Sequence, residues 1–258
     1  MVIDDGIVRR YLAGESLDAD REHWIYRAEG PESLFSAPDP ENTHWVAKLH
    51  DKLIEQIYAY VPRNHAAAKA IFPFFDEVAS DFTIMLVVGF PDPYEAMMLE
   101  SPDGESVMVF DLIQFGEESL EEDYSCHRVL THELIHMCLH RDYPQPKNPT
   151  YRADMDYLVF DEGFAHALTY PADIGSFQFD AALEDRFRTA RETLRSALAE
   201  TDPDRQRELR TAADTGRYWN KFGAIAGKLF LLKHVGDIGA IYRSGWNGFA
   251  RRVVANEP

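Results

Sequence analysis

The pattern of apolar residues predicts a helix, then a group of strands, in the first half of the chain. Apolar residues recur at helical spacing from 46 to 61 and stop at Pro62, which predicts an amphipathic helix that covers a core. Three apolar runs follow at 82–90, 94–100 and 106–115, separated by the turn sequences PDP and SPDG. These runs predict a small antiparallel meander.

Helical periodicity dominates the second half of the chain. The expected helices span about 123–141, 157–169, 181–200 and 218–234. The last of them carries Gly223 and Gly227 four residues apart, a spacing that lets another backbone approach closely. The sequence therefore predicts an α+β protein, in which a small antiparallel sheet precedes a mostly helical C-terminal half.

The predicted elements indicate one main domain. Residues 1–45 are polar and turn-rich, and we expect an N-terminal extension of unknown role. Residues 46–258 then form one domain, with a sheet part at about 80–116 and a helical part at about 119–250.

The net charge of the chain limits the classes of partner that it can bind. Lys and Arg number 26 against 44 Asp and Glu, which gives a net charge of −18. Such a surface repels phosphate backbones and anionic lipids, and no basic run offsets it, so we expect neither a nucleic-acid nor a membrane partner. The first residues lack the basic flank and apolar run of a signal peptide, and Cys126 and Cys138 form no CxxC pair. We therefore expect a reducing, cytoplasmic location.

The strongest chemical signal is the sequence HELIH, from His132 to His136, inside the helix expected at 123–141. Four residues make about one helical turn, so both imidazoles project from one face and can reach one metal ion. Glu133 lies about 100° around the axis, where it can act as a general base. This spacing is typical of zinc hydrolases.

Three residues compete to be the third ligand, because catalytic zinc takes three protein ligands and leaves a fourth position open. Glu162 lies on the next predicted helix, 26 residues after His136, and two helices joined by a loop bring such residues together easily. Asp142 fits a longer HExxH pattern, but Leu139 replaces the glycine which that pattern requires. His140 lies one turn further along, and a straight helix would carry it about 6 Å further from the ion.

The motif HELIH followed by DEGFAH resembles the gluzincin group of zinc metallopeptidases. The layout of residues 80–235 is similar to a family of predicted bacterial zinc-dependent proteases related to YjaZ. That resemblance implies a zincin-like fold, a Zn²⁺ ion held by His132, His136 and Glu162, Glu133 as general base, and a peptide or protein substrate. In that group an acidic residue often follows the ligand glutamate, whereas residue 166 is histidine here.

Several roles remain open at this stage. His166 can orient a ligand, donate to the transition state, or pack in the core. An oxyanion donor can come from any of Tyr157, Tyr170, Tyr218, Trp219 and His234. By analogy with the resembled group, the strand at 106–115 is the expected place for an extended substrate to pair.

Three hypotheses about function follow. The first is a zinc-dependent hydrolase, in particular a peptidase; the alternative is a zinc-stabilised or degenerate scaffold that binds partners without catalysis. The third is a metal-free α+β domain with incidental histidines. The sequence leaves the oligomeric state undetermined.

Overall fold

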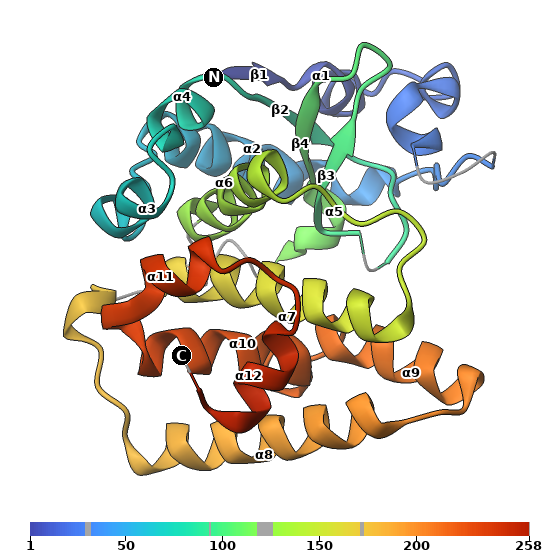
Figure 1. The fold of residues 1–258 in the computed structure, drawn as a ribbon. Helices are drawn as coiled ribbons and strands as arrows, with labels where there is room; N and C mark the ends of the chain where they lie inside the picture. The colour runs from blue at the N-terminus through green and yellow to red at the C-terminus, as the bar shows by residue number, and fades with distance from the viewer. Residues whose placement is uncertain (29–31, 93, 118–125, 171–172, 258) are drawn as a thin grey trace. The chain divides into compact units, whose positions relative to one another are not determined.

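The computed structural model describes residues 1–28, 32–92, 94–117, 126–170 and 173–257 (Figure 1). The chain divides into two compact units. Unit 1 comprises residues 1–61 and 76–133, and unit 2 comprises residues 62–75 and 134–258. The division falls inside helix α6 (Cys126–Asp142), directly after Glu133.

Unit 1 contains a mixed four-stranded sheet with the order β1-β2-β4-β3. The strands are β1 (Val2–Asp4), β2 (Thr83–Val87), β3 (Ala96–Glu100) and β4 (Ser106–Asp111). β2 pairs in parallel with β1 and with β4, whereas β3 pairs antiparallel to β4. β2 and β4 are buried except at their first residues, which explains why both read as continuous apolar runs.

The predicted antiparallel meander is wrong, because β4 lies between β2 and β3. The β3–β4 hairpin closes through a bond from the Ser101 amide to the Glu105 carbonyl (2.8 Å), and Gly104 has a φ of +80°. The mostly buried β2 takes a partner on each side, and the partly exposed β3 takes the edge. Since β4 is paired on both sides, the substrate strand expected at 106–115 is also wrong.

The last four residues of the run 106–115 form helix α5 (Leu112–Phe115) instead of strand. One oxygen of Asp111 accepts from the amides of Ile113 (2.8 Å) and Gln114 (3.1 Å), and the other accepts from Phe90 (2.7 Å). This N-cap turns the chain from strand into helix.

Residues 1–45 belong to unit 1, which differs from the polar extension expected from the sequence. Besides β1 they form α1 (Gly6–Leu12) and the 3₁₀ turns η1 (Asp20–Glu22), η2 (Trp24–Arg27) and η3 (Pro40–Asn42). About half of the large apolar residues of the segment are buried, among them Val8, Ile25 and Tyr26, and the Tyr26 hydroxyl donates to the Val88 carbonyl at 2.7 Å. Isolated apolar residues in short elements have no periodicity that a sequence can reveal.

The other helices of unit 1 follow the prediction more closely. α2 (Thr43–Tyr58) confirms the amphipathic helix expected at 46–61. α4 (Phe75–Ser80) begins at the boundary between the units and was not predicted. The predicted start of the next helix, near residue 123, lies outside the described residues.

Unit 2 is helical, and α10 (Phe222–Lys233) packs against α7 (Tyr151–Leu168) and α8 (Ala181–Ala199) (Figure 1). These three confirm the helices predicted at 157–169, 181–200 and 218–234, although Thr150 caps α7 and starts it earlier than expected. The other elements are α3 (His65–Ile71), α9 (Pro203–Asp214), α11 (Ile238–Arg243), α12 (Phe249–Ala255), η5 (Ile174–Ser176), η6 (Tyr218–Asn220) and η7 (Val235–Asp237). The protein is therefore α+β. No helix among the described residues is long and apolar enough to cross a lipid bilayer.

The backbones of α7 and α10 meet at Gly163 and Gly227. A Cβ added to Gly227 would lie 2.2 Å from the Val159 carbonyl oxygen and 2.9 Å from the Gly163 Cα. The predicted close backbone approach is thus confirmed at Gly227, whereas the atoms nearest to a Cβ at Gly223 are side-chain atoms of Leu158 and Ala213. The contact at Gly227 fixes the helix that carries Glu162.

We predict that Gly227→Ala lowers the free energy of unfolding by about 3 kcal/mol or more, because backbone atoms cannot move aside as a flexible side chain can. Gly236→Ala is the matched control, since a Cβ there meets nothing within 4 Å. Its effect should stay within about 0.5 kcal/mol. Urea unfolding followed by circular dichroism measures both values, and equal losses in the two variants would contradict the packing argument.

Candidate metal centre

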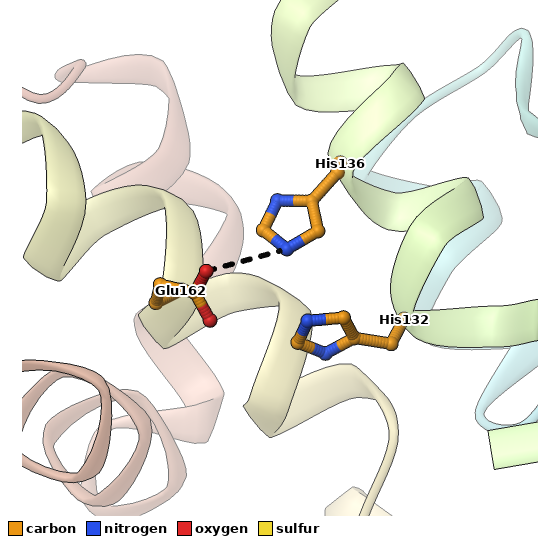
Figure 2. A group of neighbouring side chains, drawn as sticks. All are labelled: His132, His136 and Glu162. Carbon is orange, nitrogen blue, oxygen red and sulfur yellow. Dashed lines mark ion pairs between the residues drawn. The ribbon is translucent and has the colours of Figure 1, made fainter. Parts of the chain in front are cut away.

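Three of the residues predicted to bind metal converge between α6 and α7. Figure 2 shows the imidazoles of His132 and His136 projecting from α6 toward Glu162 on α7. One possible ligand atom from each residue lies within 4.8 Å of the others. His136 is buried, and the other two side chains are half-buried. The turn of helix between the two histidines brings them to one face, as the spacing predicts.

The first part of α6 is anchored to α2 within unit 1. The Cys126 amide donates to the Gln56 side-chain oxygen (3.1 Å), and His127 Nε2 lies 2.8 Å from the Gln56 carbonyl oxygen. His127 therefore makes a backbone contact away from the cluster. Burial raises the pKa of the Cys126 thiol to about 12, so this residue is not a thiolate nucleophile at neutral pH. Cys138 is equally buried, and both thiols are free.

A buried carboxylate, Asp161, lies behind His136. Its Oδ2 is 3.0 Å from His136 Nδ1, and its Oδ1 is 3.2 Å from His140 Nε2. Burial alone would raise the pKa of Asp161, but the two histidines outweigh it and hold the pKa below the ordinary value. Asp161 can thus remain ionised although it is only 9% exposed.

Asp161 and Glu162 face opposite nitrogens of His136. Nδ1 points to Asp161, whereas Nε2 lies 3.7 Å from Glu162 Oε1. A carboxylate on one imidazole nitrogen fixes the tautomer and orientation that present the other nitrogen to a metal. The sequence does not indicate a role for Asp161 beside Glu162, because neighbours on a helix diverge by about 100°. Only the packing of α6 against α7 brings both Asp161 and Glu162 to the imidazole ring of His136.

His166 lies beside the other oxygen of Glu162. The distance from His166 Nε2 to Glu162 Oε2 is 3.4 Å, across one turn of α7. Glu162 therefore has an imidazole at each oxygen. Of the roles left open for His166, orientation of Glu162 is the one that this geometry favours.

The two rival third ligands are directed elsewhere. Asp142 accepts a hydrogen bond from the Tyr242 hydroxyl on α11. His140 pairs with Asp161, and with His136 they form a second group whose ligand atoms lie within 4.8 Å. Among the described parts of the chain, Asp142 joins neither group that could hold an ion.

Three of the candidate oxyanion donors lie around a buried lysine. Lys228 of α10 is 5% exposed, and its ammonium group lies 5.1–5.8 Å from the ring centroids of Tyr170, Tyr218 and Trp219. Its Nζ donates to the Tyr218 hydroxyl at 2.5 Å. The Tyr218 ring in turn meets His166 edge-on, with centroids 5.4 Å apart. The role of Lys228 was not predicted from the sequence, although a lysine within an apolar helix is a signal that the sequence contains.

The remaining two candidate oxyanion donors, Tyr157 and His234, contact residues other than Glu162. The Tyr157 hydroxyl donates to the Tyr143 carbonyl at 3.2 Å, and burial raises the pKa of Tyr157. His234 Nε2 lies 3.4 Å from Asn256 Oδ1. Tyr218 is therefore the candidate oxyanion donor that contacts a residue beside the metal cluster, because its ring packs against His166.

The donor set of two imidazoles and one carboxylate suits Zn²⁺ with an open coordination position. No protein-family model, curated protein sequence or solved structure matches this chain. The resemblance to gluzincins therefore stays a prediction that rests on the motif and on this geometry.

We predict that Asp161→Asn weakens the affinity for Zn²⁺ by about 10- to 100-fold, because a neutral amide holds the imidazole of His136 less firmly. Competition with a chromophoric chelator measures the affinity. Asp142→Asn, on the adjoining helix but outside the cluster, should leave it unchanged. An equal affinity in Asp161→Asn and wild type would show that Asp161 does not support the site.

Proposed function

We propose that this protein is a zinc-dependent hydrolase that cleaves peptide bonds. The observation that carries the proposal is the convergence of His132, His136 and Glu162. An HExxH helix with a glutamate from the following helix matches the gluzincin pattern, and Asp161 and His166 lie where partners of the ligands are expected. The assignment of this α+β fold as zincin-like is part of the same proposal.

In this proposal each residue has one chemical task. Zn²⁺ held by His132, His136 and Glu162 would polarise the scissile carbonyl and favour loss of a proton from the attacking water. Glu133 takes that proton and delivers it to the leaving amine as the C–N bond breaks. Tyr218, with its hydroxyl held by Lys228, donates a hydrogen bond to the oxygen that gains charge. The products are a carboxylate and an amine.

Two features favour an enzyme over the non-catalytic scaffold. Structural zinc commonly has four protein ligands, whereas each group found among the described residues offers three. A purely structural site also has no use for a carboxylate at position 133. These features support the peptidase proposal, and the scaffold remains the alternative that the experiments below address.

We predict one zinc ion per chain in the wild type and a large loss of zinc in Glu162→Ala, because two histidines alone bind the ion weakly. Elemental mass spectrometry measures the ratio after purification without immobilised metal. Asp142→Ala is the matched control and should keep its zinc. Full zinc in Glu162→Ala would reject the His132–His136–Glu162 set and leave the group of His136, His140 and Asp161.

We predict that Glu133→Gln keeps zinc but lowers kcat/KM by about 10²- to 10⁴-fold, since an amide retains the shape and loses the base. Tyr218→Phe should also keep zinc and lower kcat by about 10²- to 10³-fold. Cleavage of a fluorescence-quenched peptide library supplies the substrate and the rates. Tyr58→Phe, at a residue 75% exposed, is the control. Unchanged turnover in Glu133→Gln would reject the enzyme hypothesis and favour the scaffold.

A further inference from the structure

Unit 2 has a second possible ligand site, a surface pocket of about 570 Å³ formed by α7, α8 and α12. Arg152, Arg195 and Arg251 line it, one from each helix, and Leu198 and Val254 supply apolar wall. The volume lies within the range of about 300–1,000 Å³ that is typical of small-molecule sites. We call this feature the arginine pocket.

The arginine pocket is positively charged on a strongly acidic protein. Its one carboxylate, Asp156, accepts hydrogen bonds from the Gly248 amide (3.0 Å) and the Ala250 amide (2.9 Å) at the start of α12. That carboxylate therefore serves as a helix cap. Three guanidinium groups against one carboxylate leave two positive charges in excess, although the chain carries −18. The excess positive charge of the pocket therefore favours an anionic ligand despite the net negative charge of the chain.

Asp156 is the only anionic group among the residues that line the pocket, and its charge attracts Arg152 and Arg251. Arg195 reaches the Val254 carbonyl oxygen at 3.5 Å, and Arg191 donates to the same oxygen at 2.5 Å. Burial lowers the pKa of Arg191, and the nearby Arg195 cation lowers it further. Across the part of the chain that the structure describes, neither Arg152 nor Arg251 forms an ion pair within 4.0 Å. A bound anion would relieve this crowding of positive charge.

The arginine pocket is distinct from the candidate metal centre. Asp156 precedes Glu162 by six residues of α7, which corresponds to about 9 Å along the axis and about 240° around it. The two sites thus lie on different sides of one helix. Ligand binding in the arginine pocket therefore does not depend on the proposed hydrolase activity.

We propose that the arginine pocket binds a small molecule that carries a phosphate group and an apolar body. A phosphate dianion balances the two excess charges, and planar guanidinium groups bind its oxygens in pairs. Leu198 and Val254 provide contact for an apolar body next to the charged group. A carboxylate monoanion would leave one charge unbalanced.

Isothermal titration calorimetry with phenyl phosphate tests the proposal, with the full chain at constant ionic strength. We expect saturable binding to the wild type, and binding weaker by about tenfold or more in Arg152→Gln and in Arg251→Gln. Arg188→Gln is the matched control, because Arg188 of α8 is exposed, pairs with Asp185 and does not line the pocket. Leu198→Glu is an independent variant that places a carboxylate in the wall and should abolish binding.

Several outcomes would overturn the proposal. Absence of saturable binding to the wild type would do so, as would unchanged affinity in Arg152→Gln, Arg251→Gln and Leu198→Glu. Benzoate that binds as tightly as phenyl phosphate would refute the phosphate assignment, and inorganic phosphate that binds as tightly would refute the apolar contact. We expect phenyl phosphate to bind equally well after zinc is removed with neutral 1,10-phenanthroline. A failure of the proposed metal site would therefore leave the proposal for the arginine pocket unaffected.

Discussion

The contact between the backbones of Gly163 and Gly227 is the constraint on which unit 2 depends. At this point α7 and α10 approach more closely than any side chain would allow. Glu162 directly precedes Gly163, and Lys228 directly follows Gly227, so one contact positions a proposed metal ligand and the buried ammonium group. Lys228 then donates a hydrogen bond to Tyr218, and the ring of Tyr218 contacts His166.

Helix α7 serves several purposes because successive residues turn by about 100°. Asp161 faces the histidines of α6, Gly163 faces α10, and Asp156 caps α12. Its buried charges require partners, since an unpaired charge in a low-dielectric interior is unfavourable. Asp161 has two imidazoles and Lys228 has a hydroxyl group and aromatic faces. Buried ionisable groups around one cluster are typical of a functional site, which adds support to the proposed hydrolase.

The sequence by itself determined the features that depend on local spacing. The two histidines share a face because they are one turn apart, and the amphipathic helices α2 and α8 follow from the repeat of their apolar residues. The two histidines of the HExxH motif could therefore be predicted from spacing alone, whereas Glu162 was one of three candidate third ligands and was favoured by the resemblance to gluzincins. The close approach at Gly227 was also foreseeable, because a pair of glycines four residues apart marks a helix face without side chains.

Tertiary structure decided what depends on segments far apart in the chain. The sheet order was missed because pairing partners leave no trace in the periodicity of a single strand. Asp161 and the arginine pocket were missed for the same reason: their partners come from other helices. Local periodicity reports which face of an element is buried. It does not report which element covers that face, and that choice brings the side chains of each site together.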